Sequence, residues 1–280
     1  MAARRLIVHG DDFGLSERVN EGIVHAHRQG ILTSTSVIAS GAAFEHAVAM
    51  ARETPTLDLG VHLMLSGGQP VSRRSTVSTL LGRDGFFHSD AGTFAKRYFV
   101  GFVSLQEVER ELDAQIAKVF ASGLTISHLD GHQHLHMLPG IRGLVDKLAT
   151  RYGIRCIRHP QEAPRLYMLR DISHFGRLLQ LLVLDGFCVL SRSTDAKHCD
   201  YFSGFFYGGR LTATNLSRVL AHLPSEGTCE LMCHPGEHDP SSRYSDWGYR
   251  WQEERDALTD KGIGAYLKAE RVELISYADL

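Results

Sequence analysis

The amino-acid sequence predicts an α/β fold, an irregular (β/α) barrel of about seven strands in one domain over residues 1–280. Short runs of branched apolar residues alternate with segments of helical periodicity, which is typical of parallel βα units. Polar residues follow several of these runs directly, where barrels and open α/β sheets place their sites. These residues are Asp11, Asp12, His62, Asp130, His132, Arg158 and His234. A last predicted strand near the C-terminus returns the chain to the sheet, which favours a barrel.

The first half of the chain alternates strands and helices. A branched apolar run forms the first strand, and Ser16 caps the helix that follows it. Ser104 and Glu107 have the spacing of a capping box at the start of a helix with an apolar face. Strands are expected over residues 5–9, 33–40, 57–65 and 127–132, and helices over residues 16–29, 42–52, 104–120 and 141–152. Residues 66–90 form a connection that is long for a compact domain.

The second half begins with a fifth strand, residues 154–158, which carries Arg158 and stops before Pro160. Residues 161–194 have a mostly helical pattern, and residues 200–209 form an aromatic loop or short strand. Further helices are expected over residues 212–223, 252–260 and 263–269, and further strands over residues 229–236 and 272–276. The strand over residues 229–236 places His234 at its carboxyl end, as the earlier strands do with their polar residues.

Composition excludes several classes of protein. A formal net charge of −2 argues against a nucleic-acid binder, which would carry a basic stripe. The apolar run near the N-terminus is too short for a signal-peptide core, and no segment approaches the ~18 apolar residues of a membrane span. The five cysteines are odd in number, lack CxxC spacing and suggest buried thiols rather than a zinc site. A reduced, cytoplasmic protein is expected.

A histidine-rich stretch over residues 125–139 is the strongest sign of a site. Alternate residues of a strand point the same way, about 6.6 Å apart, so His128, Asp130 and His132 are expected on one face. Gly131 allows the backbone to bend there. One histidine would suggest an exposed loop, but five ionisable groups within nine residues favour a site. Imidazole and carboxylate groups suit either a divalent metal or proton transfer.

Two adjacent carboxylates, Asp11 and Asp12, follow the first strand. Like charges so close raise one pKa unless a cation compensates. A structural role as the helix cap is the alternative, but Ser16 already fills it. His62 taken alone suggests a core histidine, and its position at a strand end gives it a place in the same site.

We hypothesise that Asp12, His62 and His132 bind one divalent metal ion and leave positions open for water and substrate. Zn²⁺ and Mg²⁺ are the favoured ions, and Mn²⁺, Co²⁺ and Ni²⁺ also suit the ligands. Asp11 would accept a proton from water and His234 would protonate the leaving group, as in amide or ester hydrolysis. Iron oxygenases share this ligand set, but they usually have all-β scaffolds.

The chain resembles the YdjC-like family of carbohydrate deacetylases, which includes the chitooligosaccharide deacetylases. The resemblance is carried by residues 8–14 (VHGDDFG), 33–36 (TSTS), 59–63 (LGVHL), 128–133 (HLDGHQ), Arg158 and 233–236 (CHPG). It implies a polysaccharide-deacetylase-like barrel and metal-dependent removal of acetyl from an N-acetylated sugar. It carries the metal ligands over to Asp12, His62 and His132, with Asp11 as base. Asp130, His134, Arg158 and Glu162 are the substrate-binding candidates.

Residues 202–209, 230–236 and 247–251 look most like the hopanoid-biosynthesis-associated members of that family. This implies an N-acetylglucosaminyl substrate on a bacteriohopane polyol. The aromatic residues of segments 94–103 and 201–207 would provide an apolar approach, and core packing or a homodimer contact is the alternative. Transient contact with the surface of the inner membrane is a further expectation. The rival predictions are a soluble chitooligosaccharide (diacetylchitobiose) deacetylase and a non-catalytic metal- or sugar-binding protein.

Overall fold

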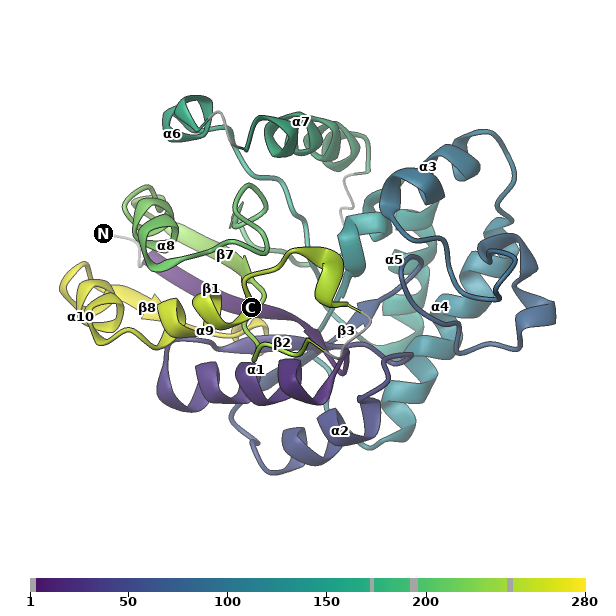
Figure 1. Cartoon of the computed structure of the whole chain (residues 1–280), viewed down its shortest axis with the longest axis horizontal. Coiled ribbons are helices and arrows are strands. Elements are labelled where there is room, and N and C mark those ends of the chain that lie inside the picture. The colour runs from purple at the N-terminus through teal and green to yellow at the C-terminus, as the bar shows by residue number, and fades with distance from the viewer. Residues whose placement is uncertain (1–3, 172–173, 192–195, 241–243) are drawn as a thin grey trace.

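A curled, all-parallel sheet forms the centre of the molecule (Figure 1). The computed structural model describes residues 4–171, 174–191, 196–240 and 244–280. Along the sheet the strands are β5 (Cys156–Ile157), β4 (His128–Gly131), β3 (Asp58–Leu63), β2 (Ser34–Val37), β1 (Arg4–Phe13), β7 (Gly227–Cys233) and β6 (Tyr201–Ser203). An eighth strand, β8 (Val272–Leu274), pairs with the first residues of β1. No ladder among the described residues joins β5 to β6, so the predicted irregular barrel is confirmed as a partly open one.

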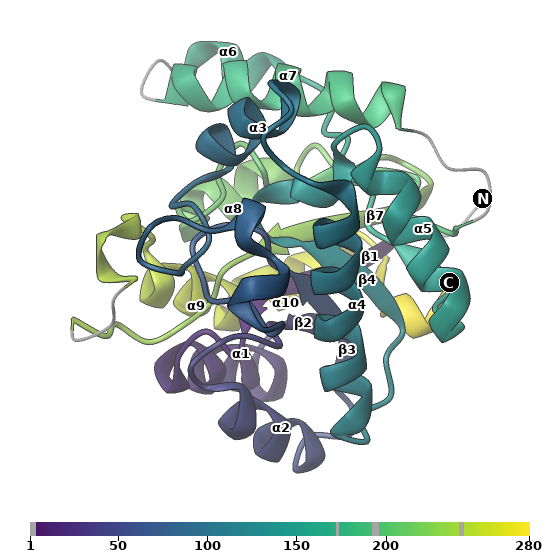
Figure 2. The same cartoon turned by 90° about the vertical axis from the view of Figure 1, so that its right-hand side faces the viewer.

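Helices pack around this sheet and connect its strands (Figures 1 and 2). They are α1 (Glu17–Gln29), α2 (Phe44–Arg52), α3 (Ala91–Phe99), α4 (Leu105–Ala121), α5 (Ile141–Tyr152), α6 (Leu166–Arg170), α7 (Phe175–Leu190), α8 (Ala213–Leu220), α9 (Trp251–Thr259) and α10 (Lys261–Ala269). One large apolar cluster fills the space between sheet and helices. In both views α6 and α7 lie at the top of the molecule, with α3 close to α7.

Helix starts show where local sequence signals hold. Ser16 caps α1 as predicted, because its Oγ accepts the Val19 N–H at 3.2 Å. The capping box predicted at Ser104 is wrong: the Ser104 side chain makes no cap bond, although α4 begins there. The Glu107 carboxylate instead accepts the N–H and O–H of Thr79. A tertiary contact therefore replaces the local one.

Two strand ends differ from the prediction at the site. The first strand extends to Phe13, because β1 pairs with β7 as far as Gly10 and with β2 as far as Phe13. Asp11 and Asp12 thus lie within the strand rather than after it. The fourth strand stops at Gly131, and His132 begins a 3-10 segment, η3 (His132–Met137).

The long connection after β3 contains two short 3-10 turns, η1 (Arg74–Thr76) and η2 (Ser78–Leu80). Glu111 of α4 is completely buried, and its two carboxylate oxygens accept the backbone N–H groups of Val71 and Ser72 at 2.8 and 2.9 Å. The neighbouring Gln115 bonds both the N–H and the carbonyl of Met64. Two polar residues on the inner face of α4 therefore fix this connection.

The cysteine prediction is confirmed, since all five cysteines are buried and unpaired. No helix within the described ranges has both the length and the apolar character needed to cross a membrane.

We predict that Glu111→Ala lowers the free energy of unfolding by about 3 kcal/mol, because two backbone donors lose charge-assisted hydrogen bonds. Glu109→Ala on the same helix is the matched control: it removes a surface pair with Lys147 and is expected to cost less than about 1 kcal/mol. Urea denaturation measures both values. Equal losses for the two variants would show that the connection does not depend on Glu111.

Candidate active site

An irregularity in β1 allows the adjacent Asp11 and Asp12 both to point into the protein interior. Side chains of a regular strand alternate between faces. The register between β1 and β2 shifts between Gly10 and Phe13, and Asp12 has a φ of 72° in the left-handed region. Asp11 and Asp12 are consequently both buried, and each faces a different set of partners.

Asp12, His62 and His132 form a compact buried cluster. The three residues offer ligand atoms that all lie within 4.8 Å of one another. Asp12 Oδ1 lies 3.1 Å from His132 Nδ1 and 3.4 Å from His62 Nε2. The buried atoms Asp12 Oδ2 and His132 Nε2 have no hydrogen-bond partner among the described residues. Two imidazoles and a carboxylate with unused electron pairs fit a divalent metal ion.

Asp130 and Ser36 both contact Nδ1 of the His62 ring. Its Nδ1 lies 2.9 Å from Asp130 Oδ1 and 3.0 Å from Ser36 Oγ. A carboxylate at the second ring nitrogen is the usual support of a metal-binding histidine, since it fixes the ring and its tautomer. Burial alone would lower the pKa of His62, but the charge of Asp130 and the neighbouring carboxylates raise it to about 10. The position therefore favours a cation.

Asp11 belongs to a second network, which is centred on the completely buried Arg158. The guanidinium bonds Asp11 through both terminal nitrogens at 2.7 and 2.8 Å. It also reaches Asp130 at 2.9 Å and Glu230 at 2.7 Å. His9 Nδ1 completes the surroundings of Asp11 at 2.9 Å from Oδ1.

These contacts keep the site carboxylates ionised. Burial alone would raise the pKa values of Asp11, Asp12 and Asp130. The guanidinium of Arg158 beside Asp11 and Asp130, and the imidazole of His132 beside Asp12, instead hold all three pKa values below the ordinary value. None of the three is therefore available as a protonated acid near neutral pH.

His234 follows β7, and its Nε2 lies 4.0 Å from Asp11 Oδ2. Its backbone N–H donates to the buried carboxylate of Glu254. Two residues after His234, Gly236 lies against Gly22 of α1, and a Cβ added at Gly22 would stand 2.3 Å from the Gly236 Cα. Burial lowers the pKa of His234 to about 4, so the ring is neutral at physiological pH.

The four predicted substrate-binding residues, Asp130, His134, Arg158 and Glu162, are all buried. Asp130 and Arg158 are completely buried, and the hydrogen bonds described above occupy them. Glu162 is also buried, and its carboxylate accepts the backbone N–H groups of Gly204 and Phe206. His134 packs against Phe202 and Phe205, with ring-centroid distances of 5.8 and 5.5 Å.

Several residues of the site were not predicted from the sequence. They are His9, Ser36, Glu230, Trp247, which stacks on His132 at 5.0 Å, and Glu254. His9 lies two residues before Asp11, so strand alternation was a usable signal for it. Nothing local marks Glu254, because it reaches His234 from a helix 20 residues away.

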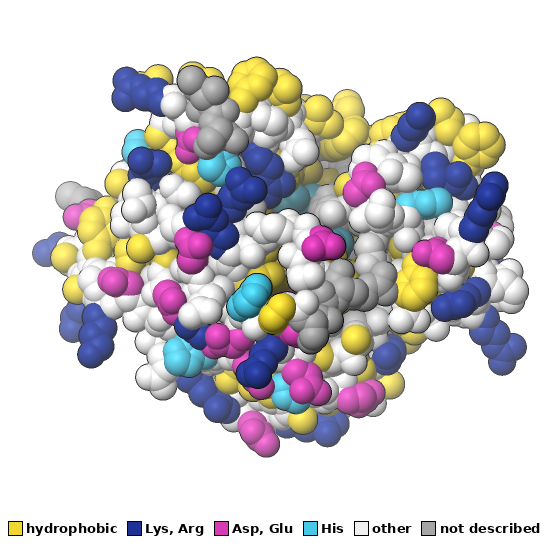
Figure 3. Space-filling view, viewed as in Figure 1, with side chains coloured by type: hydrophobic (Ala, Val, Ile, Leu, Met, Phe, Trp, Pro, Cys, Tyr) yellow, Lys and Arg dark blue, Asp and Glu magenta, His cyan; other side chains and the backbone are white. Residues whose placement is uncertain are grey.

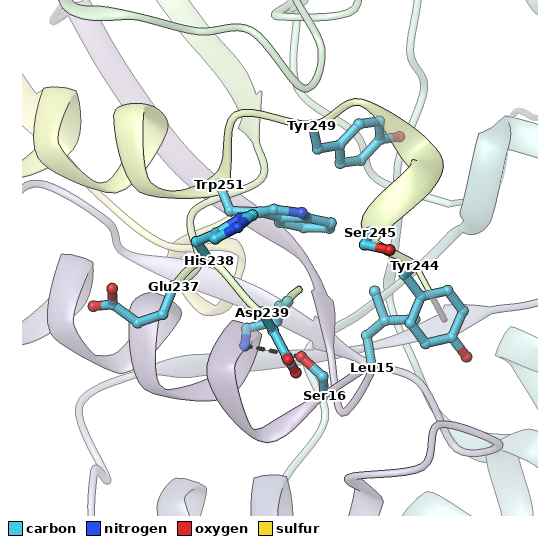
Figure 4. Close-up of a pocket in the computed structure, with 10 residues that line it drawn as sticks. Leu15, Ser16, Glu237, His238, Asp239, Tyr244, Ser245, Tyr249 and Trp251 are labelled. Carbon is cyan, nitrogen blue, oxygen red and sulfur yellow. Dashed lines mark hydrogen bonds between the residues drawn. The ribbon is translucent and has the colours of Figure 1, made fainter. Parts of the chain in front are cut away.

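A small pocket adjoins His234 between the start of α1 and the segment after β7 (Figure 4). Leu15 and Ser16 line it on one side and Tyr249 and Trp251 on the other. The Tyr249 ring also packs edge-on against His234, with centroids 4.7 Å apart. This ring therefore contacts both the pocket and His234.

The chain is similar over almost its whole length to proteins named carbohydrate deacetylases. The chain is 33% identical over 277 residues to a carbohydrate deacetylase from Brevibacillus brevis, covering 99% of each chain. It is 32% identical to a carbohydrate deacetylase from Listeria welshimeri, covering 99% of this chain and all of that one. A crystal structure from Enterococcus faecalis V583, whose name refers to cellobiose-phosphate cleavage, aligns with a TM-score of 0.81 at 27% identity over 99% of both chains. Residues 5–269 match the family described as YdjC-like protein, and the chain belongs to that family.

Proposed function

We propose that this chain is a metal-dependent hydrolase that removes the N-acetyl group from an N-acetylglucosaminyl substrate. One observation carries the proposal: Asp12, His62 and His132 converge within 4.8 Å, with the ionised Asp11 directly beside them. The relatives named carbohydrate deacetylases support the reaction and the sugar class. A bound divalent ion would polarise the acetyl carbonyl and lower the pKa of a water molecule.

The residues around the cluster would divide the remaining work. Asp11 accepts the proton of the attacking water, and Arg158 fixes the orientation of its two oxygens. His234, whose ring is neutral at the start and whose Nε2 lies 4.0 Å from Asp11 Oδ2, would take that proton from Asp11 and deliver it to the departing amine. Asp130 orients His62 and therefore acts on the metal site rather than on the sugar.

The ionisation of Asp11, Asp12 and Asp130 excludes these three carboxylates as the acid of glycosidic cleavage, the activity suggested by the name of the Enterococcus relative. Glycoside hydrolysis ordinarily requires a protonated carboxyl group as acid. Asp11, Asp12 and Asp130 all have lowered pKa values and remain charged. Metal-assisted amide hydrolysis uses a base beside the ion, and Asp11 would provide that base beside the proposed ligands.

We propose that the substrate is a hopanoid glycolipid, a bacteriohopane polyol that carries the N-acetylglucosaminyl group. The sequence resemblance described above and the apolar surroundings support it. Of the two aromatic segments, Phe94, Phe202, Phe206 and Tyr207 are buried in the core. Phe99 and Phe102 are 57% and 63% exposed, and they remain available to an apolar substrate. A soluble chitooligosaccharide is the alternative substrate.

We predict that the purified protein contains a bound divalent metal ion. Wild type is expected to hold about one divalent ion per chain, measured by inductively coupled plasma mass spectrometry after dialysis. Asp12→Ala, His62→Ala and His132→Ala should each lose it, with affinity lowered more than about 100-fold. His25→Ala, an exposed histidine of α1, is the control and should retain the ion. Full retention in all three ligand variants would refute the metal site.

The catalytic prediction separates an enzyme from a protein that only binds metal or sugar. Asp11→Asn should keep the ion but release acetate from diacetylchitobiose about 10²- to 10⁴-fold more slowly. Asp113→Asn, on the surface of α4, should behave as wild type. Undiminished turnover by Asp11→Asn at normal metal content would remove Asp11 from the role of base.

The two candidate substrates are distinguished by measuring acetate release from each at equal concentration. We expect kcat/KM for an N-acetylglucosaminyl bacteriohopane polyol, dispersed in detergent, to exceed that for diacetylchitobiose by about tenfold or more. The expected cause is the additional contact of the apolar aglycone with the enzyme. Equal or reversed values would favour the soluble chitooligosaccharide.

A further inference from the structure

Helix α7 exposes an apolar face. Its exposed large side chains follow helical spacing and lie on one side of the helix. They are Phe175, Leu179, Leu182, Val183, Val189 and Leu190, and each is between 51% and 75% exposed. The other exposed positions of this fully described helix are Gly176, Gln180 and Gly186, so its outer face carries no charge. Soluble surfaces rarely leave such a stripe uncovered.

The stripe continues onto two neighbouring helices. Phe99 at the end of α3 stacks on Phe187 of α7, with ring centroids 5.9 Å apart. Leu166 and Leu169 of α6 are 61% and 63% exposed. Apolar side chains gather along the top of the molecule in Figure 3, over α7 and over α3, with a hollow between the two lobes. We call the exposed faces of α3, α6 and α7 the apolar helical surface.

This surface lies close to the metal cluster. The inner side of α7 buries Leu184 and Cys188 against Met137, the last residue of η3. The same 3-10 segment begins with His132, and α3 also packs against it. The outer face of α7 is therefore about one helix diameter, ~10 Å, from the segment that supplies a proposed metal ligand.

The charge of these helices complements an anionic surface. Together with their capping residues they carry five bases, Lys96, Arg97, Arg165, Arg170 and Arg177, and three acids, Asp90, Asp171 and Asp185. The whole chain has a net charge of −2, so this local excess is opposite in sign. Lys96 and Arg170 are exposed beside the apolar side chains. A second copy docked symmetrically would bring two such basic sets together, whereas an anionic bilayer would neutralise them.

We propose that the apolar helical surface docks this protein on an anionic lipid bilayer, with the outer face of α7 inserted at the level of the headgroups. Apolar side chains flanked by bases are the combination by which peripheral helices bind such bilayers. The inference deepens the proposed function, on which it rests, because a sugar carried by a lipid would then be presented beside the site.

The test is flotation of the full chain with vesicles. Wild type should float with vesicles of phosphatidylcholine mixed with phosphatidylglycerol, about tenfold more than with phosphatidylcholine alone, and less at high salt. Leu179→Gln/Leu182→Gln should reduce flotation about tenfold, and Lys96→Gln/Arg170→Gln should abolish the preference for the anionic lipid. Tyr266→Gln/Leu274→Gln, which alters exposed apolar residues elsewhere, should float as wild type.

Two readouts separate this proposal from others. All variants should release acetate from soluble diacetylchitobiose at the wild-type rate, because the altered residues lie outside the site. Loss of flotation with normal turnover then identifies docking, and absent turnover with normal flotation refutes the deacetylase proposal alone. Failure of wild type to float overturns the docking proposal. So does a wild-type dimer in light scattering that Leu179→Gln/Leu182→Gln converts to a monomer, since the surface is then a contact between copies.

Discussion

The buried guanidinium of Arg158 is the constraint on which the rest of the site depends. It binds carboxylates from three strands, Asp11 of β1, Asp130 of β4 and Glu230 of β7. Charges in a protein interior are tolerated only when they are paired and hydrogen-bonded. Removing one partner of such a network leaves the others uncompensated, which destabilises a protein by several kcal/mol. The proposed base and the group that orients His62 are therefore fixed by one side chain.

The bulge in β1 gives two adjacent carboxylates different roles. Asp11 bonds Arg158 and His9, whereas Asp12 keeps a buried oxygen without a partner among the described residues. A non-glycine residue at positive φ costs on the order of 1–3 kcal/mol, and the paired strands on both sides offset it. Glycine would adopt the conformation without strain, but it would bring no carboxylate to the cluster. The strain is thus explained by the site rather than by the fold.

The sequence was informative where a signal was local or periodic. Ser16 and the range of α5 agree with prediction, because caps and helical periodicity act over a few residues. The convergence of Asp12, His62 and His132 was anticipated because parallel strands align their carboxyl ends at one edge. The bulge at Asp12 and the bond between Glu107 and Thr79 were not, since both arise from tertiary contacts. Arg158, a predicted substrate-binding residue, is buried and bonds three carboxylates, and such tertiary partners leave no local signal in the sequence.

The position of the apolar helical surface follows from the topology of the sheet. In a parallel sheet the connections that follow the strands leave from the same edge as the site. Helix α3 lies in the connection after β3, and α6 and α7 lie in the connection after β5. Helices inserted in these two connections can pack against η3, and α3 and α7 both do so. Among the residues that the structure describes, no further layer covers their outer faces. An apolar outer face in this position is therefore explained more readily by the presentation of a substrate than by the stability of the barrel.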